Sequence, residues 1–275
     1  MSLLIGADPE IFVKKNGEFH SAHGLVPGTK YEPFKVPHGA VQVDGMALEF
    51  NIDPSHSEEE FAEYIGAVMK TLDDMTPGYE LTSGATADFT PEHMASQPEE
   101  ALVLGCEPDY NAYTGKMNNP PNGEVNFRTA AGHIHIGWCD GVNPHDPDHI
   151  AACELLVREL DLRLALPFSC YDTDNRRRQL YGAPGAYRPK SYGVEYRVLS
   201  NRWLDSPELT RWVYRQVVDT FELLTKGKGE CFRNNPQDKL ESIAEGQTPP
   251  LDMVDYLNEH RLKFKISTPP MVARS

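Results

Sequence analysis

Two pairs of polar residues stand two positions apart in short apolar segments of this 275-residue chain. His133 and His135 flank an isoleucine, and Glu195 and Arg197 flank a tyrosine. Residues i and i+2 of a strand project from the same face, so each segment presents two polar side chains together. Imidazole is a common metal ligand, and a guanidinium beside a carboxylate suits a phosphate next to a cation. The alternative for both pairs is a solvated strand face, with Glu195 and Arg197 as a weak ion pair.

Four acidic residues in the first fifty positions could join the histidines in one site. Asp8 and Glu10 flank a proline that we expect to open a strand. Glu49 alternates with apolar neighbours, and Asp44 precedes a glycine in a predicted turn, where turn formation is its ordinary role. Together with the histidines, such carboxylates can hold a hard cation such as Mg²⁺ or Mn²⁺.

Positive charge is concentrated in residues 172–193 of this acidic chain. The cations there are Arg176, Arg177, Arg178, Arg188 and Lys190. We expect an irregular, glycine-containing loop whose arginines contact nucleotide phosphates. The alternative is a solvated loop or a docking patch for a protein partner. The chain lacks the P-loop, the dinucleotide fingerprint, the nucleophile elbow and the H-E-x-x-H motif.

Composition excludes several classes of protein. Acidic residues number 41 against 26 lysines and arginines, a net charge of −15, so we expect no nucleic-acid partner. We find no apolar run long enough to span a membrane and no signal peptide at the start. The five cysteines form no C-x-x-C motif, which argues against a disulfide framework or a thiolate zinc site and favours a cytoplasmic location.

The pattern of apolar residues predicts an α+β fold with a largely antiparallel sheet, because strands and helices alternate without a regular βαβ rhythm. Hairpins are expected over 10–22 and 41–52, extended segments over 80–89, 133–138 and 194–200, and long helices over 58–75, 148–166 and 208–226. Residues 105–131 and 171–192 are expected to be irregular, with short helices after 239. We predict a single catalytic domain over 1–275, with a core at 1–226 and a C-terminal helical extension at 227–275.

Five segments in a fixed order resemble the phage-encoded carboxylate–amine ligases of type 2, in the superfamily of glutamine synthetase and glutamate–cysteine ligase. The segments read GADPE, DGMALEFNI, GCEPDYNAYTG, RTAAGHIHIGW and RRRQLYGAPGAYRPKSYGVEYRVLSNRW. The likeness covers about residues 5–205. It implies a glutamine synthetase-like fold, in which a curved, mainly antiparallel sheet forms an active-site funnel with helices on its outer face.

The resemblance also implies roles for individual residues. The implied metal ligands are Glu10, Glu49, His133 and Glu195, with Asp8 in support. His135 would face the nucleotide phosphates, and Arg197 would stabilise the transferring phosphoryl group. The loop over ATP would contain Arg177, Arg178, Arg188 and Lys190. One departure is Ala183-Pro184, where a basic residue is expected after the glycine.

The implied activity is ATP- and Mg²⁺-dependent formation of an amide or peptide bond through an acyl phosphate, with Mn²⁺ as an alternative ion. The substrates would be a small-molecule or peptide carboxylate and an amine, with Asp44 as the candidate general base. A phage-encoded enzyme of this kind would act in the cytoplasm of the infected bacterium. Two alternatives stay open: a metal-dependent hydrolase, against which the basic segment argues, and a non-catalytic phage protein that binds an amino acid or peptide.

Overall fold

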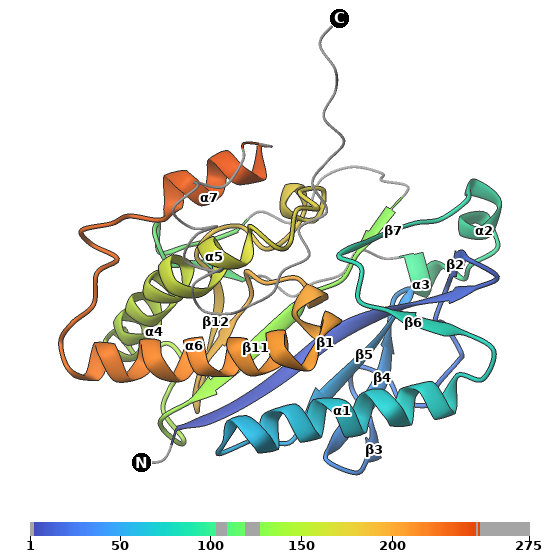
Figure 1. Cartoon of the computed structure of the whole chain (residues 1–275), viewed down its shortest axis with the longest axis horizontal. Helices are drawn as coiled ribbons and strands as arrows, with labels where there is room; N and C mark the ends of the chain where they lie inside the picture. The colour runs from blue at the N-terminus through green and yellow to red at the C-terminus, as the bar shows by residue number, and fades with distance from the viewer. Residues whose placement is uncertain (1–2, 103–108, 119–126, 246, 248–275) are drawn as a thin grey trace, which may run out of the picture.

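The computed structural model describes residues 3–102, 109–118, 127–245 and 247. It has a mixed α+β fold, as predicted, built on a large antiparallel sheet (Figure 1). Within the described residues this sheet has eleven strands in the order β3-β4-β5-β1-β11-β13-β12-β8-β9, with β2 and β6 also paired to β1. A separate sheet pairs β7 with β10.

The element boundaries follow the predictions closely for the long elements. The strands of the large sheet are β1 (Leu4–Lys15), β2 (Glu18–His20), β3 (Phe34–Val36), β4 (Gly39–Asp44), β5 (Ala47–Ile52), β6 (Glu80–Thr82), β8 (Tyr110–Asn111), β9 (Lys116–Met117), β11 (Gly132–Gly137), β12 (Ala186–Lys190) and β13 (Gly193–Tyr196). The small sheet contains β7 (Thr86–Asp88) and β10 (Phe127–Thr129). The α-helices are α1 (Glu58–Met75), α2 (Pro91–Ala95), α3 (Glu99–Leu102), α4 (Pro147–Leu160), α5 (Leu166–Phe168), α6 (Pro207–Thr225) and α7 (Gln237–Ala244).

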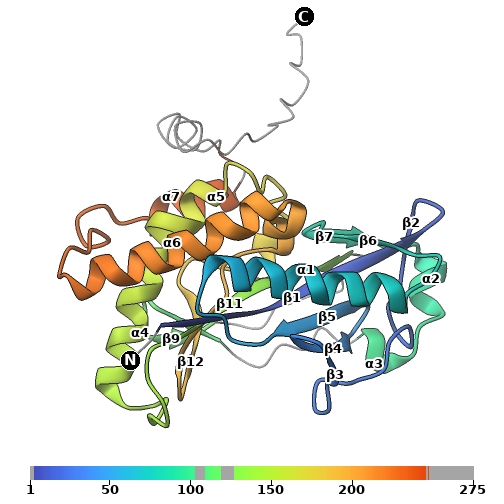
Figure 2. The ribbon, with the colours of Figure 1, turned by 60° about the horizontal axis from the view of Figure 1, so that its bottom comes forward.

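Strand β1 is the longest strand and runs through the middle of the sheet (Figures 1 and 2). It pairs with β11 along Leu4–Pro9 and with β5 at Glu10 and Ile11. The expectation that Asp8 and Glu10 open a strand is therefore wrong, since both lie in its interior. Pro9 is tolerated there because a proline, which has no N–H, stands where β1 passes from one partner strand to the other.

The helices pack on one face of the sheet. Figure 2 shows α1 and α6 side by side over the strands, with α4 beside them. Helix α1 begins after Ser57, whose side chain accepts a hydrogen bond from the Glu60 N–H, and its apolar stripe of Phe61, Ile65, Val68 and Leu72 is buried. The alternate residues of the strands, such as Ile134 and Ile136, join the same core. The opposite face of the sheet is left for polar residues.

The helix predicted over 148–166 changes its pitch before it ends. Helix α4 passes into a π-helix, η1 (Asp161–Ala165), and then into α5. Pro167 has no N–H to donate to the carbonyl of Arg163, which accounts for the wider turn before it. The predicted strand at 194–200 is shorter in the structure: β13 ends at Tyr196, and Ser200 is the N-cap of a 3₁₀-helix, η3 (Asn201–Asp205).

The two segments expected to be irregular contain regular structure. Strands β8, β9 and β10 lie in the described part of 105–131, and β12 lies in 171–192, after a 3₁₀ turn, η2 (Arg177–Gln179). Beyond residue 237, α7 buries Leu240 and Ile243 in the main core, whereas the other residues of the predicted extension from 248 onward lie outside the described residues. No helix in the described ranges combines the length and the apolar character of a membrane span.

Candidate functional site

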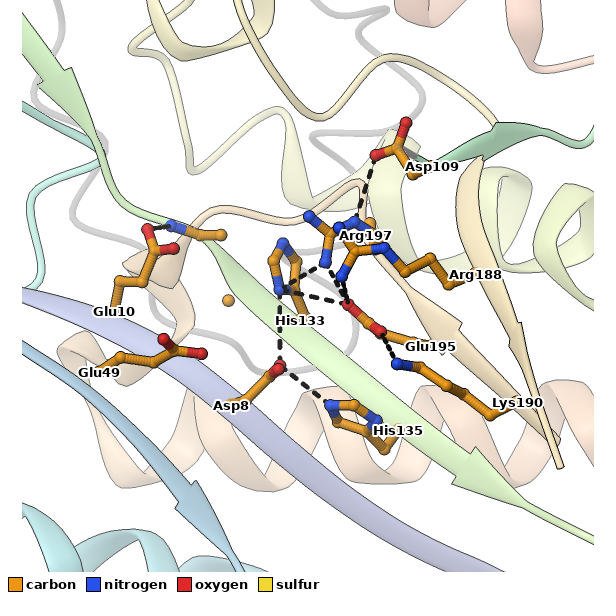
Figure 3. Close-up of polar contacts among 12 residues, drawn as sticks. Asp8, Glu10, Glu49, Asp109, His133, His135, Arg188, Lys190, Glu195 and Arg197 are labelled. Atoms are coloured by element: carbon orange, nitrogen blue, oxygen red, sulfur yellow. Dashed lines mark hydrogen bonds and ion pairs between the residues drawn. The ribbon is translucent and has the colours of Figure 1, made fainter. Parts of the chain in front are cut away.

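The polar face of the sheet is set by strand alternation and register. Asp8 lies opposite His133 across β1 and β11, and His135 lies opposite Glu195 across β11 and β13. Glu10 lies opposite Glu49 across β1 and β5. Because paired residues of neighbouring strands project from the same face, this register gathers the predicted acids and histidines on one surface (Figure 3).

Asp8, His133 and Glu195 form a compact group of candidate metal ligands. One ligand atom from each lies within 4.8 Å of the others, and no other such group is found in the described part of the chain. The His133 Nδ1 atom lies 3.5 Å from Asp8 Oδ1 and 3.7 Å from Glu195 Oε1. His135 Nε2 lies 3.1 Å from the same Asp8 oxygen. Asp8 is thus a shared partner of both histidines.

Electrostatics keep this group in the protonation states that a metal ligand needs. Burial and the nearby Arg197 charge lower the pKa of His133 to about 4, so its imidazole is neutral at pH 7. For Glu195, burial and Asp8 favour protonation, but Arg197 and the two histidines outweigh them and hold its pKa at about 2. Burial also opposes the charge of Asp8, yet His135 and His133 hold its pKa well below the usual range.

A second group of acids lies beside the first. Burial and the Asp44 charge raise the pKa of Glu10 to about 7, although Glu10 accepts a hydrogen bond from the Ala131 N–H. Burial, followed by the charges of Asp8, Glu10 and Asp44, raises the pKa of Glu49 well above its usual value. Burial raises the pKa of Asp44 as well. These carboxyls repel one another, and the structure leaves Glu10 and Glu49 outside the compact group, so their role as metal ligands stays a prediction.

Three cations surround the Glu195 carboxylate, which is 1% exposed. Arg197 donates to Glu195 Oε1 and also, through Nε, to Asp109 at 3.2 Å. Arg188 Nη1 lies 3.4 Å from Oε1, and Lys190 Nζ lies 2.7 Å from Oε2. The placement of Arg188 and Lys190 in an irregular loop was wrong: both lie on β12, which pairs Arg188 directly with Glu195.

The three consecutive arginines, at positions 176–178, have different surroundings. Arg176 pairs with Asp88 and Asp174 on the surface. Arg178 donates to Asp172 and Asn175, and it lines neither of the cavities described below, so its predicted place over ATP stays a prediction. Arg177 is buried, and its guanidinium donates to the carbonyls of Val198 and Arg197.

Gly182 makes room for the guanidinium of Arg177. A Cβ at position 182 would overlap Nη1 of Arg177, and the backbone there has a φ of +71°, which glycine adopts readily. The glycine that opens the GAPGAYRP sequence is therefore required by the arginine five residues before it. Burial lowers the pKa of Arg177 to about 10, so the group stays charged at pH 7.

Two cavities lie beside the histidines of β11. The smaller has a volume of about 70 Å³ and is lined by charged groups that include Glu10, Asp44, Arg177 and Arg197, together with His133. The larger, of about 590 Å³, lies on the His135 side. Its lining is mostly apolar and includes Gly6, Trp138 and Tyr192. The HxH strand thus presents one histidine to each cavity.

Some residues of the site were missed by the sequence analysis. Gln42 donates to Glu49 Oε2 at 2.6 Å, and the short turn that pairs Asp44 with Ala47 could have placed it opposite Glu49. Tyr192 contacts the Nδ1 atom of His135. Asp109 contacts Arg197 from a stretch without regular structure, where no sequence pattern indicated its position.

Comparison with known proteins supports the resemblance for part of the chain. Residues 123–228 match the family model described as phage phiEco32-like COOH.NH2 ligase-type 2. The matched segment contains β11, β12 and β13, and with them His133, His135, Glu195 and Arg197. The predicted resemblance is confirmed over this segment, whereas the likeness of residues 5–122 stays a prediction. No functionally curated protein matches the chain.

Proposed function

We propose that the protein is an ATP- and Mg²⁺-dependent carboxylate–amine ligase. The observation that carries the proposal is the group of Asp8, His133 and Glu195 beside an apolar cavity and a charged one, with His133 and Glu195 on strands that match the ligase family model. We further propose that the sheet forms the funnel implied by the resemblance, and that residues 1–226 carry the catalytic machinery.

The residues fit a hard divalent cation. Carboxylate oxygens and a neutral imidazole are suitable ligands for Mg²⁺ or Mn²⁺. The raised pKa values of Glu10 and Glu49 reflect negative charges held together on a buried face, and a cation would relieve their repulsion. Asp8, His133 and Glu195 would hold the ion, with Glu10 and Glu49 alongside. When bound, it would supply positive charge beside the phosphates.

The larger cavity suits the nucleotide. Its volume of about 590 Å³ falls within the usual range for small-molecule sites, and Trp138 and Tyr192 offer flat apolar surfaces to a base. His135 lies between this cavity and Asp8, which is the position for a group that contacts phosphate. Arg188 and Lys190 approach Glu195 from the neighbouring strand and add positive charge.

The proposed reaction has two displacements. In the first, an oxygen of the substrate carboxylate attacks the γ-phosphorus of ATP, and ADP leaves with the electron pair of the broken P–O bond. Arg197, held by Glu195 and Asp109, offsets the charge on the phosphoryl oxygens. In the second, the amine nitrogen attacks the acyl carbon, phosphate leaves with the electron pair of the C–O bond, and Asp44 accepts the ammonium proton. The product is an amide.

The test is the formation of ADP that depends on both substrates. The purified protein is incubated with ATP, Mg²⁺ and pools of carboxylic acids, amino acids and short peptides, and products are identified by mass spectrometry. We expect ADP, phosphate and a new amide in equal amounts, and a loss of at least about 100-fold in Arg197→Lys, which keeps the charge but changes the donor geometry. Arg176→Gln, outside the site, serves as the control.

Other outcomes would overturn the proposal. Metal-dependent cleavage without ATP would indicate a hydrolase. Binding of amino acids or peptides without any ADP formation would indicate a non-catalytic binding protein.

A further inference from the structure

The smaller cavity is lined by a buried cation, Arg177, that forms no ion pair with a carboxylate among the described residues. Arg177 is 1% exposed, and its guanidinium donates hydrogen bonds to the carbonyls of Val198 and Arg197. Within the described ranges, its Nε atom has no hydrogen-bond partner. A buried guanidinium normally has a carboxylate or phosphate partner, because an uncompensated buried charge is costly. Against the effect of burial, the charges of Asp172 and Glu10 favour the charged form of Arg177, but neither carboxylate forms an ion pair with it among the described residues. Arg177 lines the cavity and can donate hydrogen bonds to an anion there.

Carboxylates line the same cavity. Asp44 ends β4 at the tight turn to β5, and Glu10 projects from the middle of β1. Glu10 already accepts a hydrogen bond from the Ala131 N–H, whereas the Asp44 side chain forms no hydrogen bond with the described residues. A cavity of about 70 Å³ has room for roughly five water molecules, so one small group can contact both Asp44 and Arg177.

On the proposed ligase function, we infer that this cavity binds the amine substrate as a zwitterionic α-amino acid. Arg177 would donate hydrogen bonds to the α-carboxylate, and Asp44 would accept hydrogen bonds from the α-ammonium group. In an α-amino acid these two charges are separated by one carbon atom, which matches a small cavity with both signs of charge. A peptide's N-terminus would fit less well, because its α-carboxylate is replaced by an uncharged amide.

The site also indicates the size of the side chain. Phe12, Met46 and Ala101 line the cavity next to the charged groups and belong to a small apolar cluster that also includes Ala87 and Phe89. An amino acid with a small apolar side chain can contact these residues without displacing them. A charged side chain would have to enter this apolar cluster, which is costly.

Equilibrium binding without ATP tests the inference separately from catalysis. Isothermal titration calorimetry would measure glycine, L-alanine and L-lysine, and then N-acetyl-alanine and alaninamide, with the full-length protein and Mg²⁺. We expect glycine or alanine to bind most tightly. Each blocked form should bind at least about tenfold more weakly, since each removes a charge-assisted hydrogen bond.

Variants assign each half of the amino acid to its residue. Asp44→Asn should weaken alanine binding about tenfold but leave the weak binding of N-acetyl-alanine unchanged, because that compound has no ammonium group. Arg177→Lys should weaken alanine binding about tenfold but leave the binding of alaninamide unchanged, because that compound has no carboxylate. The controls are Asp73→Asn, on the exposed side of α1, and Arg176→Gln, next to Arg177 but outside the cavity. Circular dichroism checks that Arg177→Lys is folded, and Asp44→Asn gives an independent answer if it is not.

Equal binding of the blocked and free amino acids would overturn the inference, as would unchanged binding in Asp44→Asn. If no amino acid binds but the protein still forms ADP with another amine, the ligase function stands and the inference fails. If alanine binds as expected but no ADP forms with any acid, the cavity assignment stands and the ligase function fails.

Discussion

Glu195 and Glu49 lie on the same polar face but in opposite electrostatic surroundings. Glu195 contacts Arg197, Arg188 and Lys190, whereas Glu49 accepts a hydrogen bond from the neutral Gln42. The pKa of Glu195 is held at about 2, and that of Glu49 is raised well above its usual value. Two acids of one site therefore affect the folded state in opposite directions.

This difference predicts opposite stability effects from the same substitution. Glu195→Gln should destabilise the protein by about 3 kcal/mol, because it leaves buried cations without their charged partner. Glu49→Gln should stabilise the metal-free protein at pH 8 by on the order of 1 kcal/mol, because it removes repulsion and Gln42 can still donate to an amide oxygen. Both variants should lose ligase activity.

Chemical denaturation at pH 8 with a chelator measures the free energies of unfolding. Activity is then measured well below the melting temperature of the weaker variant. Destabilisation of similar size in both variants would contradict the electrostatic description of the site.

Residue types and two-residue spacing were enough to identify most of the polar face. His133, His135 and Glu195 follow from strand alternation alone, which is a local property of the chain. Local patterns could not show that Lys190 would bind Glu195 or that Arg177 would be buried. Both outcomes depend on which strand lies next to which, and that is decided by packing between distant parts of the chain.

At the scale of elements, the π-helix η1 is connected to the back of the site through one side chain. Asp161 is fully buried and accepts hydrogen bonds from Tyr196 Oη at 2.6 Å, Tyr113 Oη at 2.9 Å and the Gly185 N–H at 2.7 Å. Tyr196 separates Glu195 from Arg197 along the chain. Asp161 thus connects η1, β13 and the turn before β12.

Stability should depend on pH through this carboxyl group. Burial raises the pKa of Asp161 to about 7 in the folded state, above 3.8 in the unfolded chain. Between these values the folded protein keeps a proton that the unfolded chain loses, so the free energy of unfolding falls as the pH rises toward 7. Asp161→Asn should remove this pH dependence, because an amide does not titrate. The variant should still fold, because its amide can accept a hydrogen bond from the Gly185 N–H and donate one to Tyr196.

Urea unfolding of both proteins at pH 5 and pH 8 checks this expectation. The free energy of unfolding of the variant minus that of the native protein should be larger at pH 8 than at pH 5, by on the order of a few kcal/mol. A constant difference between the two proteins would show that Asp161 is ionised at both pH values.

The long elements could be predicted from sequence because each has a complete local pattern. The helix over 58–75 has an N-cap serine, acids in its first turn and an apolar stripe, and the structure has the same bounds. The two-residue strands β8 and β9 have no such pattern. Strand β12 was missed because its arginine and lysine resemble a solvated loop, whereas their partner is a buried acid on the next strand.

At the scale of the whole molecule, the net charge of −15 makes a cation a general stabiliser as well as a specific ligand. We predict that Mg²⁺ raises the melting temperature by several degrees beyond the effect of NaCl at equal ionic strength. Binding at about one hundred times the Kd adds about 2.7 kcal/mol. The part of the increase in melting temperature that exceeds the effect of NaCl should be lost in Asp8→Asn, which removes a charge from the compact ligand group.

Differential scanning fluorimetry with both salts measures the two effects separately. If NaCl at equal ionic strength gives the same shift as Mg²⁺, the stabilisation is screening of surface charge and not binding at the site. The nucleotide must be left out of this experiment, because it would bring its own Mg²⁺.

Strand β1 has a consequence for how the chain folds. Asp8 and its partner His133 are separated by 125 positions, whereas the other partners of β1 are β2, β5 and β6, all within the first 82 residues. During synthesis the Leu4–Pro9 part of β1 therefore leaves the ribosome long before its partner β11 exists, and the polar face stays incomplete until then. Pairing over such separations is slow because the loop must close before any contact is gained. The ligand group thus forms late in folding, because Glu195 is made only when about 70% of the 275-residue chain has been synthesised.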